Sequence, residues 1–142
     1  MKAAKLALAV VVAVVVLVPG AAAKDFRPGD LRVCAASRCL PIENQPALDA
    51  IGAFYYGSAP PTRARSPGPG APCVELRFRN GYVTGVAAGL RFDRFLSFGV
   101  NLDQFAARTW YATPARAALE IGRLATRLRP RPLPADVLSR SH

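Results

Sequence analysis

Apolar and polar side chains alternate strictly over residues 73–79, and this is the clearest pattern along the chain. The apolar positions are Val74, Leu76 and Phe78. Asn80-Gly81 follows immediately, and this dipeptide is typical of two-residue type I′ turns, in which both central residues adopt positive φ. Residues 82–92 then return to a largely apolar pattern. The pattern therefore predicts a β-hairpin with one face buried and the opposite face in water.

A two-residue turn fixes which residues face one another across the hairpin. It places Phe78 opposite Val83, and Arg77 opposite Thr84. The exposed face then carries arginines beside side chains that can form hydrogen bonds. This predicted binding surface consists of Arg77, Arg79, Tyr82 and Thr84. Guanidinium groups held by a rigid sheet are suited to bind an anion.

Two segments have apolar residues at helical spacing. The first covers residues 45–56 and follows Asn44, whose side chain can cap a helix N-terminus. The second covers residues 114–128, with Thr113 as its expected N-cap. Its apolar stripe is Ala117, Ile121, Leu124 and Leu128, and its polar stripe is Arg116, Glu120, Arg123 and Arg127. We expect the apolar stripe to cover the buried face of the hairpin.

Shorter extended segments complete the expected fold. Residues 31–33 and 40–42 predict two strands joined by a turn, and residues 95–100 predict a third strand beside the hairpin. Together these elements predict an α+β domain. It is a small antiparallel β-meander, with its hairpin at Asn80-Gly81, packed by one or two helices after a cleaved signal peptide.

The first residues have the order of a cleavable secretory signal. Lys2 and Lys5 precede an apolar segment, residues 6–18, made only of Ala, Val and Leu, and small residues follow at 21–23. This predicts a secreted or extracytoplasmic envelope protein; the alternative is a membrane anchor through residues 6–18, although that segment is short for a span. The expected parts are the signal (1–23), a cysteine turn and helix (24–56), a Pro/Gly-rich loop (57–72), the hairpin and C-terminal helix of the same domain (73–129), and a Pro/Arg tail (130–142). Residues 129–134 are expected to be extended and solvated.

Charge narrows the class of partner. The formal net charge is +10, and it becomes +8 when Lys2 and Lys5 leave with the signal. Arginine supplies nearly all of the remaining positive charge, which matches the coding bias of a GC-rich bacterial genome. Beyond that bias, a basic surface suits an anionic envelope polymer, a lipid surface or a protein partner. Export disfavours nucleic acid as the partner.

Three cysteines in an oxidising compartment allow one disulfide. Cys34 and Cys39 flank a short run of small and polar residues between two extended segments, so we expect these two to pair and Cys73 to stay free. Their C-x4-C spacing differs from the C-x-x-C spacing of redox motifs. A zinc site needs about four Cys, His or carboxylate ligands, and the single histidine is the terminal His142. We therefore expect neither a metal nor a cofactor.

Catalytic constellations are sparse in this sequence. His142, at the extreme terminus, is a poor general base for nucleophilic catalysis. Asp93 and Asp103 flank an aromatic segment and are the carboxylate pair that a small secreted hydrolase could use. The sequence thus favours a non-enzymatic envelope or secreted binding module with a basic surface, and the hydrolase is the alternative.

Overall fold

The computed structural model describes residues 25–56, 61–98, 108–135 and 137, and these form an α+β domain as expected. The strands are β1 (Leu31–Ala35), β2 (Arg38–Pro41), β3 (Pro72–Phe78), β4 (Val83–Ala88), β5 (Arg94–Ser97), β6 (Trp110–Ala112) and β7 (Arg131–Pro132). The helices are α1 (Gln45–Tyr56) and α2 (Ala115–Ala125). The expected signal at residues 1–23 lies outside the described residues.

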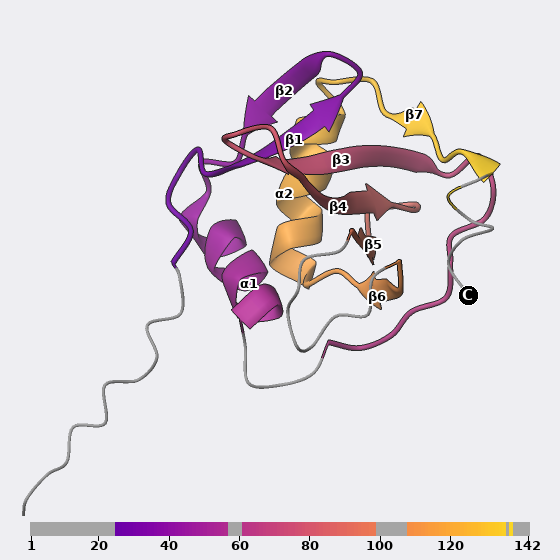
Figure 1. Ribbon diagram of the computed structural model, residues 1–142, viewed down its shortest axis with the longest axis horizontal. Coiled ribbons are helices and arrows are strands. Elements are labelled where there is room, and N and C mark those ends of the chain that lie inside the picture. Colours follow the sequence, from indigo (N-terminus) through magenta and orange to yellow (C-terminus); the bar gives the residue numbers. More distant parts are fainter. Residues whose placement is uncertain (1–24, 57–60, 99–107, 136, 138–142) are drawn as a thin grey trace, which may run out of the picture.

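Antiparallel pairing joins the strands into one sheet, in the order β2-β1-β3-β4-β5-β6 (Figure 1). β3 to β6 form a meander of sequence neighbours, and the β1–β2 hairpin is added at the opposite edge of β3. β7 pairs with that same edge of β3 beyond the end of β1, through Pro72 and Cys73. β1, β2 and β5 lie where the sequence predicts strands, whereas β6 and β7 lie where no strand was predicted.

The hairpin is where expected, but its turn is of another kind. Gly81 donates its backbone N–H to the Phe78 carbonyl at 2.8 Å, and Phe78 donates to the Tyr82 carbonyl at 2.9 Å. Gly81 has φ +87°, whereas Asn80 does not have a positive φ. The connection is therefore a three-residue loop, a type I turn followed by a glycine in the left-handed region. The predicted type I′ turn is wrong.

This longer loop shifts the strand register near the turn. Arg77 faces Val83, and not Thr84 as predicted. A β-bulge between Leu76 and Arg77 then restores the predicted pairing, so that Leu76 faces Gly85. Thr84 is the extra residue of the bulge.

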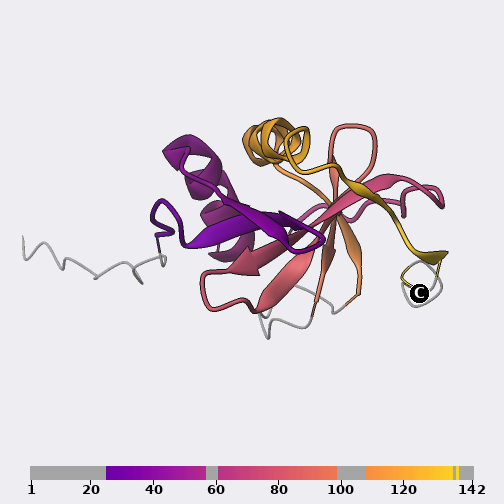
Figure 2. The same ribbon diagram turned by 90° about the horizontal axis from the view of Figure 1, so that it is seen from above.

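Both helices pack on one side of the sheet (Figure 2). The Asn44 side chain caps α1 as predicted, because its Oδ1 accepts the Ala47 N–H at 2.9 Å. Thr113 does not cap α2; Pro114 occupies that position and no side chain caps the helix. The apolar stripe of α2 shares the main core with the inner face of β1 and β3, as expected. The buried members from these elements include Leu31, Val33, Val74, Leu76, Ile121 and Leu124. Leu128 is buried in the same core but follows α2, because the helix ends at Ala125 and not at residue 128 as predicted.

The opposite face of the sheet, here called the outer face, is not wholly solvated. A second, smaller core lies there and contains Val86, Ala88, Leu96, Trp110 and Leu133. The segment after α2 runs along the sheet edge as β7, and the Leu133 N–H donates to the Ala71 carbonyl at 2.8 Å. Leu133 is consequently buried, so the expectation that residues 129–134 are solvated is wrong for this side chain.

Candidate functional site

The structure separates the four residues of the predicted binding surface. Thr84 is fully buried, and its hydroxyl lies 2.7 Å from the Tyr55 hydroxyl on α1. Burial is the main cause that raises the pKa of Tyr55. The bulge turns Thr84 to the helix side, because one extra residue in a strand reverses the direction of the side chains. The predicted placement of Thr84 on the outer face is therefore wrong.

Arg79 and Tyr82 belong to the hairpin turn and are held by close neighbours. The Arg79 guanidinium lies 3.4 Å from Asp30. The Tyr82 ring stacks on Phe78 with ring centroids 6.3 Å apart, and Tyr82 remains 54% exposed. Neither residue lines the hollow described below.

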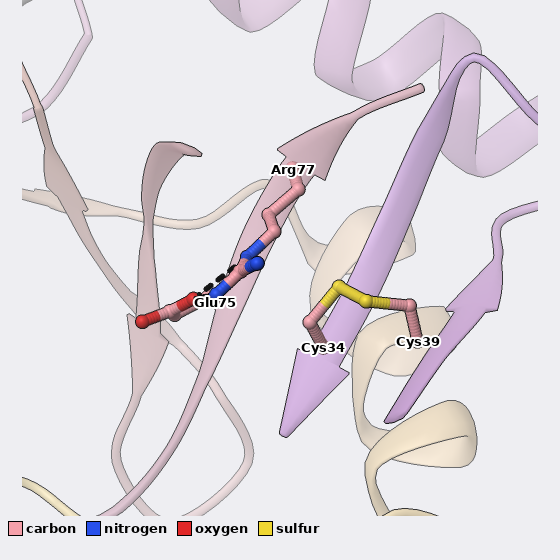
Figure 3. Close-up of a disulfide and its surroundings, with 4 residues drawn as sticks. All are labelled: Cys34, Cys39, Glu75 and Arg77. Atoms are coloured by element: carbon pink, nitrogen blue, oxygen red, sulfur yellow. Dashed lines mark hydrogen bonds and ion pairs between the residues drawn. A yellow bond between two sulfur atoms is a disulfide. The ribbon is translucent and has the colours of Figure 1, made fainter. Parts of the chain in front are cut away.

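Arg77 does lie on the outer face, where it forms an ion pair with Glu75 of the same strand (Figure 3). Its Nε donates to Glu75 Oε2 at 2.8 Å. Arg32 of β1 is its direct partner across the strand pair, and Arg32 is exposed. Arg32 and Arg77 therefore lie directly opposite each other on adjacent strands, and of these two only Arg77 has a carboxylate partner in the described structure.

Beside Arg77 the outer face is hollowed. This outer hollow has a volume of about 450 Å³, and its walls are the β1–β2 turn on one side and residues 131–134 on the other. Val86 and Phe98 line its apolar part, together with Leu133 and Val137. Arg77 of β3 and Arg131 of β7 line it as well, and so does Glu75, which is paired with Arg77. The outer hollow thus joins an apolar surface to two guanidinium groups from different strands.

The Cys34–Cys39 disulfide is present as predicted and links β1 to β2 at the wall of the outer hollow (Figure 3). The two residues face one another in the strand register, with their Cα atoms 4.1 Å apart. The strands extend further than expected, so that only Ala36 and Ser37 form the turn.

Cys73 is a free, half-buried thiol that also lines the outer hollow. Desolvation by burial raises the pKa of the Cys73 thiol, and the charge of Glu75 raises it further. Arg131, which faces Cys73 across the strand pair, opposes this shift. Since the thiolate is the nucleophile, this environment makes Cys73 a weak nucleophile near neutral pH.

The residues of the hydrolase alternative are only partly within the described structure. Asp93 Oδ2 lies 3.6 Å from Arg94 Nε, which is the ion pair of a solvated turn. Asp103 and His142 lie outside the described residues. In the described part of the chain, no group of three or more His, Cys, Asp or Glu side chains is placed to hold a metal ion.

Comparison of the chain with family models, curated proteins and solved structures finds no match. Among the residues that the structure describes, neither helix is long and apolar enough to cross a membrane. The geometry of the outer face is accordingly the basis on which a function can be proposed.

Proposed function

We propose that this chain is an exported, non-enzymatic binding module and that the outer hollow binds an anionic ligand with an apolar part. One observation carries the proposal: Arg77 and Arg131 line the same hollow as Val86 and Phe98. Ligand sites commonly combine an apolar lining with a few polar groups that fix orientation. The volume of about 450 Å³ falls in the usual range for such sites.

The arrangement of charge favours an anionic ligand in particular. Arg32 and Arg77 face one another, and like charges directly across a strand pair are destabilising. Glu75 offsets part of this repulsion through Arg77. Arg131 adds a further positive charge across the outer hollow. A carboxylate, sulfonate or phosphate group bound in the outer hollow would accept charge-assisted hydrogen bonds from Arg77 and Arg131.

The apolar part of the ligand would lie against Val86, Phe98 and Leu133. This favours a small amphipathic anion, or the anionic and apolar end of an envelope polymer, over a uniformly charged polymer. The Cys34–Cys39 disulfide at the wall is consistent with an oxidising, extracytoplasmic compartment.

The proposal is tested with anilinonaphthalene sulfonate, a fluorescent probe that combines a sulfonate with apolar rings. The protein is purified from the fraction to which the expressing cell exports it, and the probe is titrated into the protein at fixed ionic strength. The double variant Arg77→Gln/Arg131→Gln should bind the probe about tenfold more weakly, because it removes two charge-assisted hydrogen bonds. The matched control is Arg27→Gln/Arg65→Gln, which removes two exposed charges that line no described hollow.

The two double variants lose the same net charge, so a general charge effect would weaken probe binding equally in both. Equal losses, or no loss in either variant, would contradict the proposal. Melting curves of both variants should show that the fold is retained, because the Arg77–Glu75 pair is partly exposed and contributes about 1 kcal/mol or less to stability.

A further inference from the structure

Two leucines on the helix side of the molecule are almost wholly in solvent. Leu90, in the turn between β4 and β5, is 93% exposed, and Leu119 of α2 is 79% exposed. Single exposed leucines are common, but these two line the same groove between the turn and the helix. This leucine groove has a volume of about 650 Å³.

The turn that carries Leu90 is held firmly beside α2. Figure 2 shows it rising on the helix side, next to that helix. Phe92 is buried, and its ring reaches α2 at Gly122, where a Cβ would lie 3.6 Å from the ring. Gly89 has φ +105°, and its carbonyl accepts the Phe92 N–H at 3.3 Å. Leu90 therefore projects from a closed turn whose position is fixed by Phe92.

Arginines flank both leucines. Arg116 and Arg123 lie one helical turn before and after Leu119 on the same exposed stripe of α2, and Arg91 follows Leu90 directly. Arg123 is neutralised by Glu120, with both nitrogen–oxygen distances at 2.8 Å. The structure shows no carboxylate partner for Arg91 or Arg116 within its described part. One carboxylate, Asp93, also lines the groove, and it is paired with Arg94. The surface around the leucine groove is thus apolar at its centre and mainly basic at its edge.

We propose that the leucine groove docks on an anionic lipid bilayer, with Leu90 and Leu119 inserted among the acyl chains. Basic side chains beside inserted apolar ones are typical of proteins that lie on anionic membranes. A second copy of the chain fits less well, because it would bring like charges together. Projecting leucines need no complementary pocket in a fluid bilayer, whereas a protein partner would have to supply one.

The test uses the exported protein and two kinds of vesicle, pure phosphatidylcholine and a mixture with phosphatidylglycerol. The protein should co-sediment with the anionic vesicles and much less with the neutral ones. Leu90→Ser/Leu119→Ser should weaken this binding at least tenfold, since it removes both inserted side chains. The control Tyr82→Ser removes an exposed apolar side chain elsewhere and should bind within about twofold of the unchanged protein.

A second readout follows insertion directly. Leu90→Trp should show a blue-shifted emission on anionic vesicles, against a constant signal from the buried Trp110. Equal binding by the leucine and Tyr82 variants would contradict insertion and indicate a purely electrostatic contact. Absence of vesicle binding would also overturn the proposal and favour an acidic protein partner. Arg77→Gln/Arg131→Gln should weaken vesicle binding no more than the charge-matched Arg27→Gln/Arg65→Gln, so this proposal and that for the outer hollow can fail separately.

Discussion

At Gly85 of β4, we expect that adding a single methyl group lowers the stability of the fold strongly. A Cβ added there would lie 2.5 Å from the Leu96 carbonyl oxygen and closer still to the Phe95 ring. Ordinary contacts of a Cβ begin at 3.4 Å, so about 1 Å of movement is needed. The carbonyl belongs to β5, which pairs with β4, and it cannot move alone.

The Phe95 ring is also restrained. It packs edge-on against Phe54 and Tyr55, with ring centroids 5.5 and 5.9 Å away. Overpacking of this kind costs about 1–3 kcal/mol and sometimes more. Gly→Ala also reduces the entropy of the unfolded chain, which returns about 0.4–1 kcal/mol. We therefore expect Gly85→Ala to lower the free energy of unfolding by about 2 kcal/mol and the Tm by about 5–10 °C in a domain of this size.

Thermal unfolding followed by circular dichroism measures this change. Gly68→Ala is the matched control, because a Cβ at Gly68 has no atom within 4 Å and its φ is not positive. The control should melt at or slightly above the Tm of the unchanged protein. If Gly85→Ala melts within about 2 °C of it as well, the close approach of Phe95 and Leu96 over Gly85 is wrong.

Three further predictions concern the cysteines and the buried carboxylate of α2. Replacing Cys34 and Cys39 by alanine should lower stability by about 2 kcal/mol, as a melt would show, because the disulfide closes a short loop; an unchanged Tm would contradict this. Hydrogen bonds from Arg123 lower the pKa of Glu120, so the ionised carboxylate should stabilise the fold fully above the usual carboxyl pKa, and this stabilisation should be lost as the pH falls through the lowered pKa. In melts at pH 2–5, Arg123→Gln should therefore lose less stability with falling pH than the unchanged protein. An equally steep loss in both proteins would refute this prediction. Cys73, whose pKa is raised, should react with a disulfide reagent more slowly than free cysteine at pH 7, and it should react faster after unfolding. Equal rates for the folded protein, the unfolded protein and free cysteine would contradict a half-buried thiol with a raised pKa.

Features with a local cause could be predicted from the sequence. α1 covers residues 45–56 as expected, because the Asn44 cap and the spacing of apolar residues both act within one helix. The Cys34–Cys39 pairing follows from two extended segments and a short connection. The apolar stripe of α2 could be read in the same way.

The hairpin shows where local reasoning was insufficient. Asn80-Gly81 is compatible with a type I′ turn and also with a type I turn followed by a left-handed glycine. The bulge that accompanies the second choice turns Thr84 inward, where its hydroxyl meets that of Tyr55. That partner lies 29 residues away in the sequence, so no window around the turn could reveal it.

The outer hollow could not be predicted either, because its second wall comes from the end of the chain. Leu133 stands between two prolines and Val137 lies four residues further on, and the two form no periodic pattern with the rest of the core. The exposed position of Leu119 could have been predicted from the sequence, since this leucine stands between arginines on the polar stripe of a helix. Its meaning depends on Leu90, which only the folded turn brings beside α2.

The most direct test of the proposed function is a map of where an amphipathic anion binds. The protein, labelled with nitrogen-15, is titrated with anilinonaphthalene sulfonate, and the backbone amide shifts are followed by nuclear magnetic resonance. We expect the largest shifts at residues 73–77, at Arg131 and at Leu133, which line or adjoin the outer hollow. Largest shifts around Leu119, or small shifts spread over all basic surfaces, would contradict the proposal that the outer hollow is the binding site.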